Sequence, residues 1–135
     1  MINNIKQAIS DKLKQLYPRH TIYDEDVPQN FREPSFLITL TNQDYGKLLN
    51  TKFKSLLSFD ISFFSDKDKT EIKEDCQGVQ MALFRAFDLV GGYRILNKQA
   101  SIVDNILHFT FDVSVSEMIE EDSTKMQKQQ TNTNL

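Results

Sequence analysis

Near the end of the chain, apolar and polar side chains alternate without a break. The apolar members are Leu107, Phe109, Phe111, Val113 and Val115, and the polar members are His108, Thr110, Asp112, Ser114 and Ser116. Because successive side chains of a strand point to opposite faces, this pattern predicts a strand with one buried and one solvated face, as is typical of antiparallel sheets. The segment Lys52–Phe64 also alternates, interrupted only by Ser55 on the apolar side and Leu56 on the polar side, and it is long enough to extend past the sheet as an arm.

Two other segments have the spacing of helices. Apolar residues recur at steps of three and four in each, which places them on one helix face. The first helix is expected over residues 4–17 and ends before Pro18, with Ile2, Ile5, Ile9, Leu13 and Leu16 on its apolar face. The second follows a charged turn at residues 65–69 and ends at Gly91-Gly92, because glycine readily adopts the left-handed conformation of a helix C-cap. Its core face is Ile72, Cys76, Val79, Leu83, Ala86 and Phe87.

The remaining segments complete a predicted order of α-β-β-β-α-β-β. We expect further strands at Thr21–Asp24, residues 35–41 and Tyr93–Val103, a loop at 24–34, a linker at 42–50 and a tight turn at Asp104-Asn105. This order predicts an α+β fold, a two-layer sandwich with two helices packed on a mainly antiparallel sheet. The chain then divides into one domain, residues 1–118, and a polar C-terminal tail, residues 119–135, whose lack of apolar side chains predicts disorder.

Composition limits the function classes. The chain has 135 residues, enough for one domain, and a formal net charge of −3 with dispersed basic residues, which argues against nucleic-acid binding. A single cysteine, Cys76, excludes an internal disulfide and a cysteine-based zinc site, so we expect folding inside a cell. No segment has the pattern of a signal peptide or of a membrane span.

The sequence contains no constellation typical of catalysis, so we predict a protein that is not an enzyme and has neither cofactor nor metal. His20 and His108 are expected at the surface, and Cys76 falls on the core face of the second helix. The acidic run Asp24-Glu25-Asp26 lacks calcium-loop spacing and is interpreted as a solvated loop or a partner contact. Gly91-Gly92 follows a helix and so is not a phosphate-binding loop.

Phe31 is an aromatic residue in a polar loop, next to Arg32. Two readings stay open: the ring folds back onto the core, or it is an exposed anchor for another subunit, since aromatic residues and arginine are enriched at interface hot spots.

Two blocks resemble those of phage tail terminator proteins. The first is Ile22-Tyr23-Asp24-Glu25-Asp26 followed by Asn30-Phe31-Arg32-Glu33-Pro34-Ser35-Phe36. The second is Gly92-Tyr93-Arg94 followed by Ile102-Val103-Asp104-Asn105-Ile106-Leu107-His108-Phe109, in which Asn105 departs from the more usual Asp-Gly turn. The strand Ser58-Phe59-Asp60-Ile61-Ser62-Phe63-Phe64 is also similar, and the resemblance extends over about residues 2–117.

This resemblance implies a ring, usually a hexamer, on the head-proximal end of a tail tube in a phage or prophage. Such a ring stops tube polymerisation and joins the tail to the neck (head–tail connector) proteins. It would assemble in the cytoplasm of the host bacterium and then remain in the neck region of the virion tail. Its partners would be copies of itself, the tube protein and a neck protein, with no membrane and no specific nucleic acid.

The surfaces expected to make these contacts are the loop at 24–34 and the start of the long strand. Their residues are Asp24, Glu25, Asp26, Phe31, Arg32, Glu33, Lys52 and Lys54. Two alternatives stay open: another head–tail adaptor, neck or virion structural component, and a small-ligand-binding module.

Overall fold

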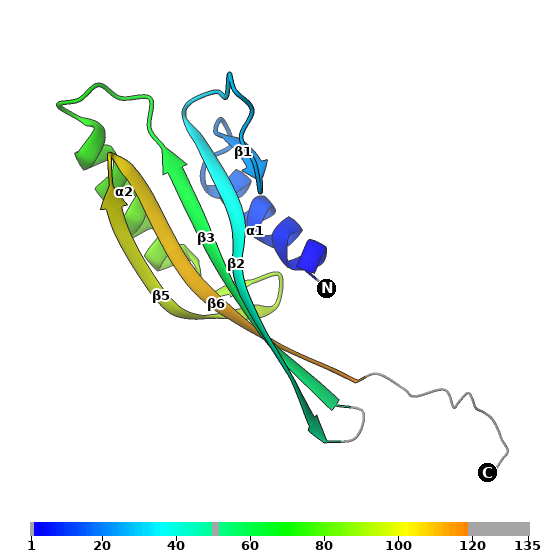
Figure 1. Cartoon of the computed structure of the whole chain (residues 1–135). Helices are drawn as coiled ribbons and strands as arrows, with labels where there is room; N and C mark the ends of the chain where they lie inside the picture. Colours follow the sequence, from blue (N-terminus) through cyan, green and yellow to red (C-terminus); the bar gives the residue numbers. More distant parts are fainter. Residues whose placement is uncertain (1, 50–51, 119–135) are drawn as a thin grey trace, which may run out of the picture.

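The computed structural model describes residues 2–49 and 52–118, so the predicted tail at 119–135 lies outside the described residues. Two helices and six strands follow the predicted order, with one short extra strand after the second helix (Figure 1). The fold is therefore α+β, as the sequence predicts. In chain order the elements are α1 (Ile2–Leu16), β1 (Thr21–Asp24), β2 (Ser35–Leu49), β3 (Lys52–Phe64), α2 (Ile72–Ala86), β4 (Leu89–Val90), β5 (Tyr93–Val103) and β6 (Ile106–Met118).

The strands form a curled, mixed sheet in the order β1-β2-β3-β6-β5-β4. Every pair is antiparallel except β1 and β2, which run parallel. The loop at residues 25–34 provides the return connection that this parallel pair needs. The sheet is thus mainly antiparallel, whereas the strict two-layer arrangement stays a prediction.

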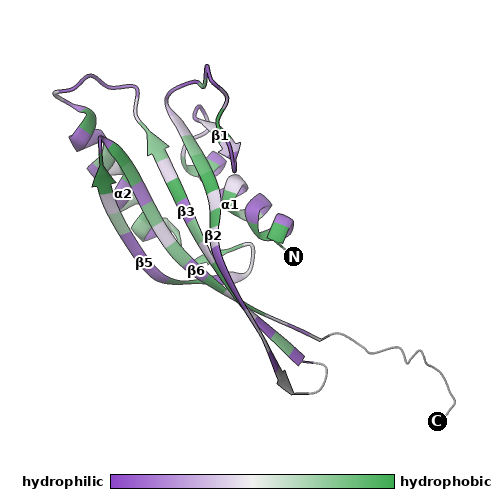
Figure 2. Ribbon diagram, in the orientation of Figure 1, coloured by the Kyte–Doolittle hydropathy of each residue, from purple (hydrophilic) through white to green (hydrophobic). Residues whose placement is uncertain are grey.

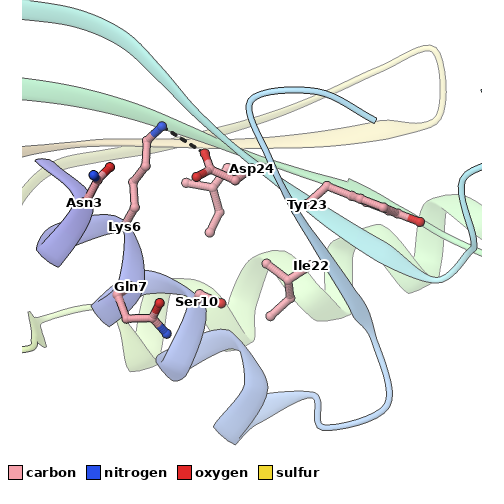
Figure 3. A pocket seen from close by; sticks show the side chains of 8 residues that line it. Asn3, Lys6, Gln7, Ser10, Ile22, Tyr23 and Asp24 are labelled. Atoms are coloured by element: carbon pink, nitrogen blue, oxygen red, sulfur yellow. Dashed lines mark hydrogen bonds and ion pairs between the residues drawn. The ribbon is translucent and has the colours of Figure 1, made fainter. Parts of the chain in front are cut away.

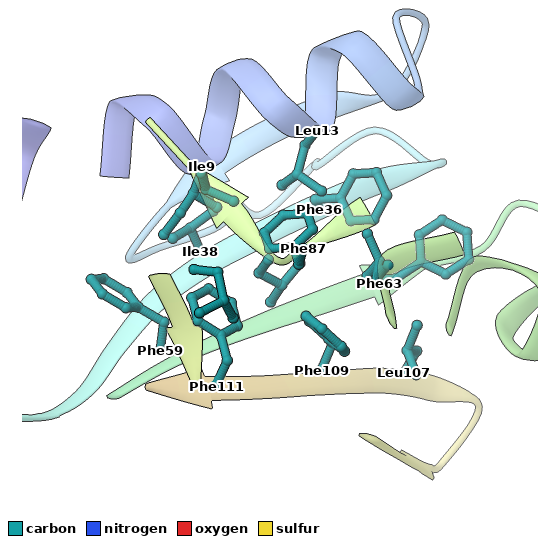
Figure 4. Packing of buried hydrophobic residues seen from close by; sticks show 14 of the residues in the cluster. Ile9, Leu13, Phe36, Ile38, Phe59, Phe63, Phe87, Leu107, Phe109 and Phe111 are labelled. Atoms are coloured by element: carbon teal, nitrogen blue, oxygen red, sulfur yellow. The ribbon is translucent and has the colours of Figure 1, made fainter. Parts of the chain in front are cut away.

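The core lies between the helices and one face of the sheet (Figure 4). Both helices contribute one apolar stripe each, and the strands contribute the alternate residues that the sequence pattern assigns to the buried face. Aromatic rings fill much of this space, with Phe109 touching the rings of Phe84, Phe87 and Phe111. The largest fully buried side chains are Phe36, Phe59, Phe63, Phe87, Phe109, Phe111, Ile5, Ile9, Leu13, Ile38, Leu57 and Ile61.

β2 is longer than the sequence predicts, because residues 42–49 continue the strand instead of linking two strands. Its pairing with β3 shifts by one residue between Leu40 and Asn42, which leaves Thr41 as the extra residue of a β-bulge. The Thr41 hydroxyl donates to the Ser58 carbonyl at 3.1 Å. A bulge reverses which face alternate residues occupy, so the even-numbered core positions before Thr41 give way to odd-numbered ones after it.

The glycine pair Gly91-Gly92 does not end the second helix, so that prediction is wrong. α2 ends at Ala86, with Phe87 at the cap, and the glycines form the turn between β4 and β5. Both have positive φ, as a tight hairpin turn requires. A Cβ on Gly91 would lie 2.5 Å from the Cβ of Ala8, so this turn packs against α1. The predicted turn at Asp104-Asn105 is confirmed, and both of its residues also have positive φ.

A three-stranded arm projects beyond the body of the sheet (Figure 1). We define the arm as residues 42–49 of β2, 52–56 of β3 and 114–118 of β6, which pair in that order. β1 reaches only to Ile38 of β2, and β5 reaches only to Val113 of β6. Figure 2 shows hydrophilic and hydrophobic residues alternating along the strands that enter the arm.

Candidate interaction surfaces

The acidic residues that follow β1 are tied to α1. Lys6 projects from α1, and its ammonium lies 2.9 Å from a carboxylate oxygen of Asp24 and 2.5 Å from one of Glu25. Figure 3 shows the Lys6 side chain extending away from the helix toward Asp24. Asp24 and Glu25 therefore stabilise the docking of α1 against β1, and only part of each carboxylate is available to a partner.

Glu25 also completes the edge of β2 where β1 stops. Its backbone N–H donates to the Ile38 carbonyl at 2.9 Å, and its carboxylate accepts from the Leu40 N–H at 3.0 Å. Glu25 adopts a positive φ of 67°, which turns the chain away from the sheet after β1. The carboxylate thus replaces the next strand residue as the acceptor for Leu40.

The electrostatics of this contact follow from its geometry. The hydrogen bond from Lys6 and the bond from the Leu40 N–H lower the pKa of Glu25, and burial opposes them only in part. For Lys6, burial lowers the pKa, but the hydrogen bonds to Glu25 and Asp24 outweigh it, so the net shift is upward. Both groups are held in their charged forms.

Phe31 folds back toward the end of the sheet. Its ring packs edge-on against Phe64 at 5.0 Å between centroids and lies 6.5 Å from the ring of Tyr23. The Tyr23 hydroxyl accepts a hydrogen bond from the Arg32 N–H at 3.0 Å, which fixes the loop beside this aromatic group. The ring is half-buried against the end of the sheet but lies outside the main core, so its packing matches the first sequence reading only in part, and its role as a subunit contact stays a prediction.

The other predicted loop residues remain at the surface. Asp26, Arg32 and Glu33 are exposed, and they lie on the loop held in place by Glu25 and Phe31. Of the six loop residues predicted from sequence, Asp24, Glu25 and Phe31 hold the loop in place through their side chains, although both carboxylates are also exposed. Asp26, Arg32 and Glu33 form the exposed group of the loop.

The two predicted lysines, Lys52 and Lys54, lie on the arm, away from the loop. Both are exposed and share the face of β3 opposite the core. On the other face of the arm, Tyr45 stacks on Phe53 at 5.4 Å between centroids, and the Lys47 ammonium lies 6.0 Å from the Phe53 ring. Tyr45 remains 51% exposed, the state of an aromatic residue that no neighbouring element covers. Sequence reasoning missed Tyr45 and Lys47 because it placed them in a linker.

The polar face of the sheet contains one group that resembles a catalytic triad in composition only. His108 Nδ1 lies 3.0 Å from Asp60 and 3.3 Å from Ser62, which are its neighbours on β3. A triad needs the carboxylate and the hydroxyl on different ring nitrogens, so that one orients the ring while the other is deprotonated. Here both contact the same nitrogen, so the group ties two strands together and has no nucleophile–base geometry.

His20 and Cys76 are packing residues. His20 is half-buried, not at the surface as predicted, because its ring stacks on Phe36 and Phe63 at 5.4 and 5.8 Å. Burial lowers its pKa, although Asp75 and Asp66 act in the opposite direction. Cys76 is fully buried, and burial followed by the nearby Asp75 raises the pKa of its thiol, which makes it a poor nucleophile.

One hollow between α1 and β1 is a candidate for a small ligand. It has a volume of about 270 Å³ and is lined by Asn3, Lys6, Ser10, Ile22 and Asp24, among others. Its only cation, Lys6, already pairs with two carboxylates, so no free charge converges on the space. Within residues 2–49 and 52–118, no group of three or more histidine, cysteine or acidic residues could hold a metal ion, and no helix is long and apolar enough to cross a membrane.

The described residues thus form an α+β body that carries an exposed loop and a three-stranded arm. A family model described as "Phage tail terminator protein" matches residues 4–125. The chain therefore belongs to the phage tail terminator family, whose members are structural components of the virion tail and not enzymes.

Two further comparisons add little. No curated protein sequence matches the chain. A solved structure titled only by a sequence identifier shares 10% identity over 89% of this chain and 96% of its own, with a TM-score of 0.35.

Proposed function

We propose that this chain forms a ring that caps the head-proximal end of a phage tail tube, stops tube growth and joins the tail to a neck protein. The observation that carries this proposal is the tail terminator match over residues 4–125. The ring is assembled from copies of this chain, with a hexamer as the expected size. Assembly takes place in the cytoplasm of the host bacterium, and the finished ring stays in the neck region of the tail.

Two surfaces suit this role. A ring that also binds a tube and a neck protein needs several contact surfaces on each copy, including two unlike patches for its neighbours in the ring. The exposed group of the loop, Asp26, Arg32 and Glu33, presents both charges on a segment that Glu25 and Phe31 hold in place. The arm presents the second surface, with Lys52 and Lys54 on one face and Tyr45 on the other.

The direct test is the mass of the purified chain by sedimentation velocity, together with negative-stain images, alone and with its tube protein. We expect a concentration-dependent ring that binds one end of each tube and limits tube length. A chain that stays monomeric with tubes present, and leaves tube length unchanged, would refute the proposal.

The loop is tested separately with the double variant Phe31→Ala with Arg32→Ala and with Arg32→Ala alone. The single variant leaves the Phe31 packing intact, so it isolates the exposed guanidinium from loop order. We expect both variants to weaken ring formation or tube capping, whereas Lys73→Ala on the outer side of α2 should not. If ring and cap both survive the double variant, the loop is not an interface.

A further inference from the structure

Among residues 2–49 and 52–118, no strand pairs with either outer edge of the arm. Residues 42–49 of β2 have β3 on one side, and their other side lies beyond the end of β1. Residues 114–118 of β6 also have β3 on one side, and they lie beyond the last β5 pair at Ile95 and Val113. Alternate residues of such strands point N–H and C=O groups outward, which makes each edge a template for another strand.

Natural edges usually carry features that block indiscriminate pairing, namely charged side chains, bulges, proline or a short strand. The β6 edge has no proline along Ser114, Val115, Ser116 and Glu117, but Glu117 places a negative charge on the core-side face. The β2 edge has a bulge at each end of its run of eight residues and carries Lys47 on the same face. Each edge is therefore suited to a strand that offers the opposite charge at this position.

The direction of the strands restricts how a ring can use both edges. β2 and β6 each run antiparallel to β3, so they run parallel to each other. A rotation about the ring axis keeps the direction of each strand along that axis. Where the β6 edge of one copy meets the β2 edge of the next, the new pair must therefore be parallel. A pair of like edges would instead be antiparallel and would close as a dimer.

Side chains on the two edges complement each other row by row. Lys47 and Glu117 both lie opposite Phe53, so they share one row and one face of the arm, on opposite edges. The adjacent row has Tyr45 and Val115, both opposite Ser55. Placing two arms side by side without an offset would bring Glu117 of one copy to Lys47 of the next, and Val115 to Tyr45.

We propose that the β6 edge of the arm pairs in parallel with the β2 edge of a second copy, so that the arms join into one continuous sheet around the ring. The proposal rests on the ring of the proposed function and specifies its subunit junction. The partner strand belongs to a second copy of the chain, because the two edges of one arm complement each other. Lys47 and Glu117 supply opposite charges in one row, and Tyr45 and Val115 supply apolar contact in the next. The junction also covers the Tyr45 ring, which is half exposed in the single chain.

Charge reversal tests the junction. Lys47→Glu and Glu117→Lys each place like charges across it, and we expect each to raise the concentration needed for rings by about tenfold or more. An equimolar mixture of the two variants should recover rings of even number, because copies can alternate so that every junction again joins opposite charges. Lys73→Glu has the same charge change on α2 and should leave assembly unaltered.

Cross-linking tests the register. In the double variant Lys47→Cys with Glu117→Cys, the two thiols of one copy are separated by two strand spacings, roughly 10 Å, which is too far for a disulfide. Across the proposed junction they are adjacent. Oxidation should therefore give a ladder of linked copies that ends at the ring number, while the buried Cys76 stays unreacted.

The outcomes separate the two proposals. If both charge-reversal variants form rings of normal mass and the double cysteine variant gives no ladder, the proposed junction is wrong and the ring itself is still supported. If cross-linking stops at two copies, identical edges pair in antiparallel fashion and the parallel junction is wrong. A wild-type chain that never assembles would remove the proposed function and the junction together.

Discussion

Single residues fix how the two edges of the sheet meet α1. Glu25 connects β1, β2 and α1 through one carboxylate, and Gly91 lets the β4–β5 turn approach the same helix. The sequence predicts a contact role for the acidic run but gives no sign of Lys6, which lies 18 and 19 residues earlier. Ion pairs between distant residues leave no periodic signal, so only the folded chain reveals this one.

Glu25→Ala removes the acceptor for the Leu40 N–H and the partner of Lys6. We expect a loss of about 1 kcal/mol in the free energy of unfolding at pH 7, since the group is partly exposed and the pair is screened. The folded-state pKa of Glu25 lies below its ordinary value, so its contribution is present at neutral pH and fades as the pH falls through 4.5 and below. Urea unfolding at pH 7 and at pH 3 measures this contribution. The difference in the free energy of unfolding between variant and wild type should be smaller at pH 3. Glu25→Gln, which keeps an acceptor, should lose less.

Gly91→Ala and Gly92→Ala form a matched pair. Both glycines have positive φ, so both variants carry backbone strain of about 1 kcal/mol. Only at Gly91 does the new Cβ meet another residue, Ala8, whereas Gly92 faces open space. We expect Gly91→Ala to lower the free energy of unfolding by about 1–3 kcal/mol more than Gly92→Ala does. Equal losses in urea titrations would show that the turn does not pack tightly on α1.

The sequence predicts most elements to within a few residues and fails where a pattern is short or out of phase. α1, β3, β5 and β6 agree with their predicted ranges, although Ser55 and Leu56 interrupt the alternation of β3 and the pairing of β5 shifts between Leu96 and Gln99. α2 follows the charged turn as predicted but ends at Ala86, before the glycine pair. β2 was shortened because the bulge at Thr41 reverses its alternation, so that residues 42–49 appear irregular in sequence. β4 was missed because two residues cannot establish a period, and the glycine pair beside it was assigned to the helix instead.

Amide hydrogen exchange should distinguish the arm from the body. In the unassembled chain, outward amides of residues 42–47 and 114–117 should exchange quickly, because no strand covers them. In the ring they should be slowed, while amides of central β3 near Ile61 are protected in both states. Exchange in the arm that is the same before and after assembly would show that neither edge is paired.

At the scale of the whole molecule, one core joins both helices to the sheet. Every buried apolar side chain of the described residues belongs to this cluster. The sequence predicts this core because alternate residues of the strands and single faces of the helices supply it, and the resemblance to tail terminators supplied the family that the comparison confirms. The functional surfaces could be predicted only in part, since exposed residues follow no burial pattern.

Phe109→Ala should destabilise the whole domain. The ring is fully buried among Phe84, Phe87 and Phe111, so its loss leaves a cavity between α2 and the sheet. We expect a loss of about 3–5 kcal/mol in the free energy of unfolding, a large part of the stability of a typical domain. Calorimetry and near-ultraviolet circular dichroism should each report a single unfolding transition, at the same temperature in both and lower than in the wild type. Phe84→Ala, at a half-buried position, should cost less.

The extra residue at Thr41 determines what the distal half of β2 can offer to its surroundings. If Thr41 paired with Ser58 and the chain kept its length, Asp44 and Gly46 would occupy the face that Tyr45 and Lys47 occupy now. The packing of the sheet body up to Leu40 would be unchanged, but the side chains of the projecting half of β2 would face the opposite side of the arm. The bulge at Thr41 thus decides which chemistry the protein presents to a neighbour along this half of the strand.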